Sequence, residues 1–138
     1  MNAENELRDR LLTAAREAAP NAVAPYSGIH VAAALLTAAG EVVTGVNVES
    51  ASYGLTCCAE RVALFNALSK GHREFTAMGL ISSVDPCLVP CGACRQLLAE
   101  YAPKARVWCS NLQRPEIVRS TSVAELLPDP LVSLPEYG

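Results

Sequence analysis

The sequence predicts a three-layer α/β domain built on a mixed sheet of about five strands. Segments with apolar residues at helical spacing alternate with short apolar or alternating segments, in the order α-β-β-α-β-α-β-β-α. The chain of 138 residues has the usual size of one domain and contains neither an internal repeat nor a linker. We therefore expect a single domain over residues 1–138.

The first half of the chain predicts one helix followed by a β-hairpin. Apolar residues from Leu7 to Ala19 recur at helical spacing and Pro20 closes the segment, which predicts an amphipathic helix over residues 4–19. A β-branched apolar run and an alternating run then flank a glycine-containing turn, as is typical of a hairpin. These three parts are residues 29–36, the turn at 38–41 and residues 42–48.

The second half predicts three helices and three strands. A helical pattern follows Gly54 and ends at Gly71, where a C-cap glycine belongs. Ser122 and Glu125 form a capping-box pattern for a short last helix. The other elements are a strand at residues 75–83, a helix at 91–101 that Pro90 opens, and strands at 106–110 and 116–120.

The composition bears on location. Apolar residues make up 51% of the chain, so other subunits are expected to cover part of its surface. The longest apolar stretch, Val31 to Leu36, is far shorter than the ~20 residues that span a bilayer. The first ten residues alternate in charge where a signal peptide would be apolar. We expect a cytoplasmic protein with no membrane partner.

Charge and cysteine content bear on the substrate and the chemistry. The net charge is -3 and no stripe of Lys and Arg is present, which argues against a nucleic acid partner and favours a small substrate. In a cytoplasmic protein, six cysteines indicate metal or thiol chemistry rather than disulfides. Three of them, Cys57, Cys87 and Cys109, are expected to be small buried apolar residues.

The strongest pattern combines three cysteines with one acid. Cys58 and Glu60 are followed, 33 positions after Cys58, by Cys91 and Cys94 within Pro-Cys-Gly-Ala-Cys. Residues three apart on a helix share one face, so two sulfurs can point to one locus and Cys58 can supply a third. Zinc takes thiolates in tetrahedral geometry, and catalytic zinc sites keep one position for water. We therefore expect Cys58, Cys91 and Cys94 to hold Zn2+.

The two residues after Ala59 have predicted roles beside this metal. Glu60 is turned about 200° from Cys58 on the helix, so we expect it to move protons at the water position rather than ligate the metal. Three thiolates leave a net negative charge on one Zn2+, and Arg61 is the candidate counter-charge. The alternatives are a dipole-stabilised helix glutamate for Glu60 and an exposed helix arginine for Arg61.

These residues resemble the cytidine deaminase superfamily, whose signature is His or Cys, then x-Glu, then Pro-Cys-x-x-Cys. The resemblance is to the small homotetrameric, zinc-dependent cytidine deaminases, and it extends over nearly the whole chain. It implies a three-layer α/β/α fold and one zinc-dependent deaminase domain. The matching segments are residues 24–27 (APYS), 45–49 (GVNVE), 51–56 (ASYGLT), 58–61 (CAER), 90–96 (PCGACRQ) and 125–128 (ELLP).

The resemblance implies hydrolysis of cytidine or deoxycytidine to uridine or deoxyuridine and ammonia, as in pyrimidine salvage. Zinc-activated water would attack C4 of the base while Glu60 transfers protons. Asn47 and Glu49 would bind ribose hydroxyls, Ala59 and Glu60 would read the pyrimidine, and a homotetramer would share its active sites between subunits. Capping or turn hydrogen bonds are the alternative for Asn47 and Glu49.

Two departures from the family pattern leave other substrates open. Ile29 and Leu131 stand where relatives commonly carry phenylalanines that contact the pyrimidine ring, so the pocket would be aliphatic and differently shaped. The same chemistry on blasticidin S or on an N4-substituted cytidine is one alternative. A structural zinc module would need a fourth protein ligand. A thioredoxin-like redox role for Cys91 and Cys94 would require that no third thiol lie nearby.

Overall fold

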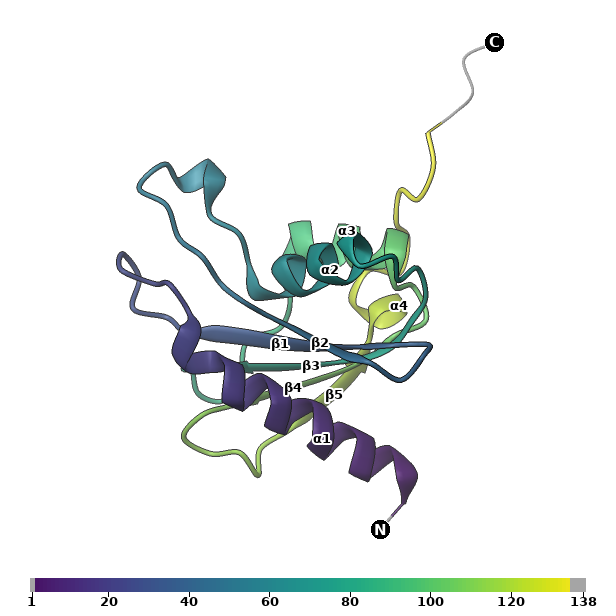
Figure 1. The fold of residues 1–138 in the computed structure, drawn as a ribbon, viewed down its shortest axis with the longest axis horizontal. Coiled ribbons are helices and arrows are strands. Elements are labelled where there is room, and N and C mark those ends of the chain that lie inside the picture. Colours follow the sequence, from purple (N-terminus) through teal and green to yellow (C-terminus); the bar gives the residue numbers. More distant parts are fainter. Residues whose placement is uncertain (1, 135–138) are drawn as a thin grey trace.

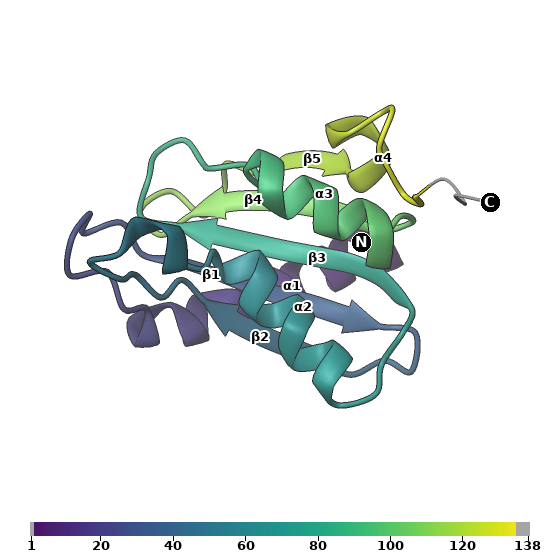
Figure 2. The same ribbon diagram turned by 90° about the horizontal axis from the view of Figure 1, so that it is seen from above.

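The computed structural model describes residues 2–134 and contains a five-stranded mixed sheet with helices on both faces (Figures 1 and 2). Within this range no helix combines the length and the apolarity needed to cross a membrane. The helices are α1 (Ala3–Ala18), α2 (Ala59–Ser69), α3 (Gly92–Tyr101) and α4 (Val123–Leu126), with short 3-10 helices at Ala19–Asn21 and Tyr53–Leu55. The strands are β1 (Val31–Thr37), β2 (Val42–Val46), β3 (Phe75–Ser82), β4 (Arg106–Asn111) and β5 (Arg119–Ser122).

The predicted order of helices and strands is confirmed, but both hairpin strands are shorter than expected at the end near Asn47. Strand β1 begins at Val31 instead of Ile29, and β2 ends at Val46 instead of Val48. The Asn47 side chain explains the first difference: its Oδ1 accepts from the Val31 N–H at 2.9 Å and its Nδ2 donates to the Ile29 carbonyl at 2.8 Å. A side-chain amide therefore replaces the backbone ladder at this point.

Strand β5 also lies elsewhere than predicted, at Arg119–Ser122 instead of residues 116–120. The preceding loop is held by side chains of β4. The Ser110 hydroxyl donates to the Ile117 carbonyl at 2.7 Å, and the Asn111 Oδ1 accepts from the Arg114 N–H at 2.7 Å. These contacts keep the loop out of the sheet, so pairing with β4 starts later.

The strand order places two helix starts at the same end of the sheet. The order is β2-β1-β3-β4-β5, and β1 is antiparallel to both β2 and β3. Strands β2 and β3 are therefore parallel to each other, and their carboxyl ends lie at one end of the sheet. Helix α2 follows β2 and α3 follows β3, so both helices begin there, side by side on the same face (Figure 2).

Strand β1 is buried on both faces, which makes the fold three layers thick (Figure 1). Ala33 and Leu35 belong to a core with α2, α3 and α4, while Ala32 and Ala34 belong to a second core with α1. The alternation follows from the two-residue period of a strand. The helix predicted over residues 4–19 is α1, and its predicted apolar face packs on the sheet. The buried residues of this face are Leu11, Leu12 and Ala15.

Gly45 allows α2 to lie unusually close to β2. A Cβ atom built on Gly45 would lie 2.3 Å from the Ala63 nitrogen and 2.8 Å from the Ala59 carbonyl oxygen, and both are backbone atoms that cannot rotate away. The missing side chain therefore sets the height of the first turns of α2 above the sheet. This first turn carries Glu60.

We expect Gly45→Ala to lower the free energy of unfolding by about 3 kcal/mol, because overpacking must displace the helix backbone. Urea unfolding, monitored by circular dichroism, measures this change in the free energy of unfolding. Gly54→Ala is the matched control, because its Cβ would meet nothing within 4 Å. We expect a change below about 0.5 kcal/mol for the control. Equal urea midpoints for the two variants would contradict the close packing of α2 on β2.

Candidate active site

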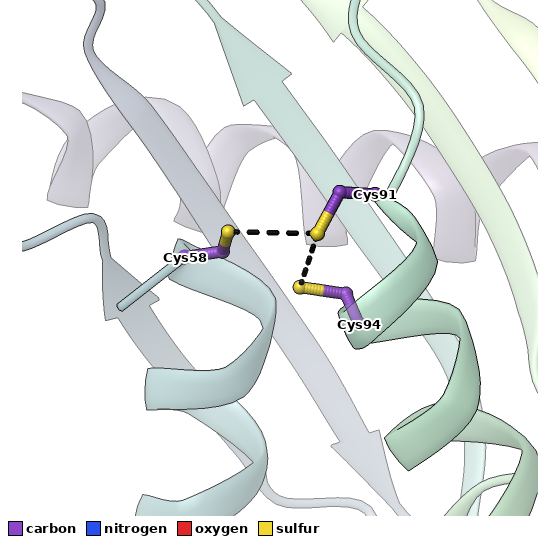
Figure 3. A group of neighbouring side chains, drawn as sticks. All are labelled: Cys58, Cys91 and Cys94. Carbon is purple, nitrogen blue, oxygen red and sulfur yellow. Dashed lines mark hydrogen bonds between the residues drawn. The ribbon is translucent and has the colours of Figure 1, made fainter. Parts of the chain in front are cut away.

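Three cysteines meet where α2 and α3 begin (Figure 3). Cys58 is the N-cap residue of α2 and Cys91 is the N-cap residue of α3, both with extended backbone, and Cys94 lies in the first turn of α3. The sulfurs of Cys58 and Cys91 are 3.8 Å apart, and those of Cys91 and Cys94 are 3.6 Å apart. The predicted convergence of the three thiols is confirmed.

The spacing of the sulfurs fits a tetrahedral zinc ion. Two ligands that are each 2.3 Å from a tetrahedral centre lie about 3.8 Å apart. All three Sγ atoms lie within 4.8 Å of one another. Among residues 2–134, no fourth His, Cys, Asp or Glu side chain joins this group of possible metal ligands. Three protein ligands are the number found in catalytic zinc sites, which use the fourth position for water or substrate.

The geometry also bears on the redox alternative. That role for Cys91 and Cys94 required that no third thiol lie nearby, and the Cys58 sulfur lies 3.8 Å from that of Cys91. The arrangement therefore contradicts a simple two-cysteine redox centre. A group of three thiols suits a metal ion instead.

Hydrogen bonds favour the thiolate form of Cys58. The Cys94 thiol has the largest effect, and together with the Arg61 guanidinium and the Cys91 thiol it lowers the pKa of Cys58 to about 5. The Arg61 Nη2 donates to the Cys58 sulfur at 3.6 Å and to the Thr56 carbonyl at 3.4 Å. The positive charge of Arg61 thus lies against the Cys58 sulfur, and the residue is partly buried rather than exposed.

Glu60 is a buried carboxyl group beside the thiols. Its exposed fraction is 5%, and it lies in the first turn of α2 outside the group of three sulfurs. Burial, followed by the nearby Cys58, raises the pKa of Glu60 to about 7. A carboxyl group with a pKa near neutral pH can both accept and donate a proton under those conditions.

A pocket of about 380 Å³ opens beside the sulfurs. Its size suits a small molecule. Five of its lining residues, Ile29, Asn47, Glu49, Ala59 and Glu60, are the residues that the sequence analysis assigned to substrate or proton transfer. The rest of its lining consists of Ser27, Val31, Thr56, Cys57, Cys58, Leu80, Leu88, Val89 and Cys91.

Asn47 and Glu49 make the turn and capping hydrogen bonds that were the alternative for them. Asn47 bridges Ile29 and Val31 through one donor and one acceptor. Glu49 accepts from the Ser27 hydroxyl and, at 3.0 Å each, from the backbone N–H groups of Tyr26 and Ser27. An amide has two donors and a carboxylate has about four acceptor positions, so each side chain keeps capacity for a ligand.

Several features of the site were not predicted. Leu131 lies outside the pocket lining with an exposed fraction of 62%, and its carbonyl accepts from Gln96. Leu88 and Val89 line the pocket, although no periodic pattern marks the loop before α3.

The three remaining cysteines differ in burial. Cys109 is fully buried as expected, whereas Cys57 and Cys87 are only partly buried. The expectation of a small buried residue is therefore met by Cys109 and only in part by Cys57 and Cys87. Cys57 directly precedes the metal-site residue Cys58 and lines the pocket, which explains its partial exposure.

Comparisons with known proteins agree with this geometry. Residues 5–110 match the family model described as cytidine and deoxycytidylate deaminase zinc-binding region. A protein of Halalkalibacterium halodurans named cytidine deaminase is 45% identical over 122 residues, which cover 88% of this chain and 91% of that protein. A protein of Bacillus cereus named Blasticidin-S deaminase is 33% identical over 107 residues, which cover 72% of this chain and 74% of that protein.

The fold agrees as well. The crystal structure of cytidine deaminase from Burkholderia pseudomallei superposes with a TM-score of 0.84 at 44% identity, covering 95% of this chain and all of the other. The matched family region contains Cys58, Cys91 and Cys94, so the group of thiols coincides with a zinc-binding region. The chain therefore belongs to the cytidine deaminase family.

Proposed function

We propose that this chain removes the 4-amino group of cytidine or deoxycytidine by hydrolysis, giving uridine or deoxyuridine and ammonia. The observation that carries this proposal is one pocket in which the buried Glu60 adjoins a three-thiol metal site. The family supplies the reaction class, and relatives named cytidine deaminase cover most of the chain. The reaction breaks the C4–N bond of the base and forms a C4–O bond, and the amino group leaves as ammonia.

Glu60 is the residue that moves protons in this scheme. Zn2+ held by the three cysteines would lower the pKa of a water molecule and so supply the nucleophile of the hydrolysis. The Glu60 carboxylate would accept a proton from the attacking water and donate it to N3 of the pyrimidine, and the second proton of that water would pass to the amino group, which leaves as ammonia. Its burial keeps bulk water from competing for the proton, and it lines the pocket beside the three cysteines without belonging to the group of possible ligands.

Other residues of the pocket bind the substrate. Asn47 has one free amide N–H and Glu49 has one free acceptor position, so the pair can hold a sugar hydroxyl through one donated and one accepted hydrogen bond. The Ala59 backbone lies beside Glu60 and is the candidate partner for the base. Ile29 forms part of the apolar wall against the pyrimidine ring.

Arg61 offsets the charge of the site. Three thiolates around one Zn2+ carry a net negative charge, which would weaken the metal as an acid toward water. The guanidinium group contacts the Cys58 sulfur directly, and the positive ends of α2 and α3 add to its effect. Arg61 therefore restores acidity to the site without occupying a ligand position.

The proposal includes a homotetramer with active sites shared between subunits. Large apolar side chains are exposed in the 3-10 helix directly before the pocket residue Thr56, where Tyr53 and Leu55 have exposed fractions of 79% and 74%. Their segment projects away from the body of the chain (Figure 1), as a segment that contacts another copy would. A cytoplasmic location and a single deaminase domain over residues 1–138 stay predictions, and residues 1 and 135–138 lie outside the described part of the chain.

A second candidate keeps the chemistry and changes the substrate to blasticidin S. The relative named Blasticidin-S deaminase shares 33% identity with this chain. In addition, the pocket wall is built from aliphatic side chains such as Ile29, Leu88 and Val89. An aliphatic wall lacks the ring stacking that favours a particular orientation of the pyrimidine.

The ligand assignment predicts one zinc ion per chain and its loss when a ligand is removed. Loss of residues that only support metal ligands costs 10–100-fold in affinity, so we expect Cys58→Ser and Cys94→Ser to weaken zinc binding by more than about 100-fold. Competition with a chromophoric chelator measures this affinity. Cys87→Ser is the control because Cys87 lies outside the group of three thiols. Unchanged affinity in Cys58→Ser would refute the assignment.

The role of Glu60 predicts that Glu60→Gln retains zinc but loses turnover. We expect kcat to fall by at least about 100-fold, because a positioned general acid and base contributes that much or more. Ammonia release and the ultraviolet spectrum of cytidine report the rate, and metal analysis reports zinc. Glu100→Gln, on the exposed side of α3, should match the wild type. An active Glu60→Gln enzyme would remove Glu60 from the mechanism.

The two substrate candidates predict different rankings of kcat/KM. If the main proposal holds, cytidine and deoxycytidine are deaminated at least about tenfold more efficiently than blasticidin S, which corresponds to about 1.4 kcal/mol in transition-state binding. Parallel assays of ammonia release with the three compounds measure the ranking. The reverse ranking would favour the second candidate, and no release from any of them would overturn both.

A further inference from the structure

The Ser27 hydroxyl lies at the centre of a small hydrogen-bond relay at the mouth of the pocket. Its oxygen accepts a hydrogen bond from the Ile29 N–H at 3.0 Å. The same hydroxyl donates to one oxygen of the Glu49 carboxylate, in a short contact. Because the hydroxyl has one proton, and Ile29 approaches its lone pair, that proton is directed to Glu49.

The other oxygen of Glu49 is held by the same turn. The backbone N–H groups of Tyr26 and Ser27 both donate to Oε1 at 3.0 Å. The turn is closed by the Gly28 N–H, which donates to the Ala24 carbonyl at 3.0 Å, and Gly28 has a positive φ of 71°. Two fixed backbone donors thus hold one oxygen of the carboxylate, and within residues 2–134 the Ser27 hydroxyl is the one hydrogen-bond donor to the other oxygen.

This arrangement matters because Glu49 is partly exposed. Without a partner, a glutamate side chain near the surface samples several rotamers. If a ligand has to select one of these rotamers, the lost freedom of the side chain weakens binding. The hydrogen bonds from Ser27 and Tyr26 fix it instead, and the Ser27 hydroxyl is the largest influence that lowers the pKa of Glu49. The carboxylate is therefore charged and oriented before any ligand arrives.

We propose that Ser27 is a positioning residue for substrate binding, which acts by orienting the Glu49 carboxylate toward the sugar hydroxyl. This inference rests on the proposed function, in which Glu49 accepts a hydrogen bond from the sugar. Ser27 takes no part in proton transfer at the base, because it contacts neither Glu60 nor the three thiols. Its loss changes the binding of nucleosides that carry a sugar hydroxyl and leaves the chemical step intact.

The test is the steady-state kinetics of Ser27→Ala and Ser27→Thr with cytidine and with 2′,3′-dideoxycytidine. For Ser27→Ala we expect KM for cytidine to rise about five- to tenfold with kcat within about twofold, because the Glu49 carboxylate is no longer pre-oriented and must then be ordered on binding. 2′,3′-Dideoxycytidine lacks the 2′- and 3′-hydroxyls, to which the proposal assigns the Glu49 contact, so its kcat/KM in Ser27→Ala should stay within about twofold of the wild-type value. Ser27→Thr keeps the hydroxyl and should restore KM for cytidine.

A double-mutant cycle separates positioning from a general effect on the fold. In a Glu49→Ala background, Ser27→Ala should change KM by less than about twofold, because its effect acts through the missing carboxylate. Ser69→Ala, at the exposed end of α2, is the matched serine control and should behave as wild type. Thermal unfolding of each variant accompanies the kinetics.

Three outcomes would overturn the inference. These are an unchanged KM for cytidine in Ser27→Ala, an equal loss with 2′,3′-dideoxycytidine, and a full effect of Ser27→Ala in the Glu49→Ala background. Turnover of cytidine by the wild-type protein distinguishes failure of the Ser27 inference from failure of the proposed function. If the wild type releases ammonia from cytidine and Ser27→Ala is unaffected, only the inference fails. If the wild type releases none, the proposed function fails and the inference falls with it.

Discussion

The site depends on the convergence of two helix N-termini at one end of the sheet. Because β2 and β3 are both antiparallel to β1, the helices that follow them begin side by side. Each start presents free N–H groups and a positive dipole end, which favours thiolates at these positions. Cys58 and Cys91 occupy the two N-cap positions, so topology and electrostatics place the metal ligands together.

The same packing positions Glu60, the proposed proton-transfer residue, relative to the three cysteines. Two positions after Cys58, the helix carries Glu60 into the pocket beside the sulfurs but outside the group of three possible ligands. Gly45 lets this first turn lie close to β2, so the position of Glu60 depends on a strand residue outside the pocket lining. A larger side chain at position 45 of β2 would therefore move Glu60 relative to the three cysteines.

The sequence was most informative where the pattern is local. Apolar spacing predicted α1, and the position of Gly71 predicted the end of α2. The Cys-x-x-Cys spacing predicted that Cys91 and Cys94 would point to one locus, because the helix geometry fixes their relation. The approach of Cys58 was expected from its place at the start of another helix, and the strand order shows why the two helix starts meet.

Predictions that depend on tertiary contacts were less accurate. The start of β1 depends on the Asn47 amide, and the start of β5 depends on the Ser110 hydroxyl, neither of which a periodic pattern reveals. The aliphatic wall at Leu88 and Val89 comes from an irregular loop. The role of Ser27 is hidden for the same reason, since it arises from a contact with a residue 22 positions away.

The location of the ligands on two separate helices has a thermodynamic consequence. A metal ion shared by Cys58 and Cys91 cross-links two residues that are 33 positions apart and closes the loop between them. Such a closure restricts the unfolded chain, and a comparable disulfide loop contributes about 3–4 kcal/mol. Since the unfolded chain has no preformed site, metal affinity becomes part of the folding free energy. The melting temperature of the protein will therefore rise with the concentration of free zinc.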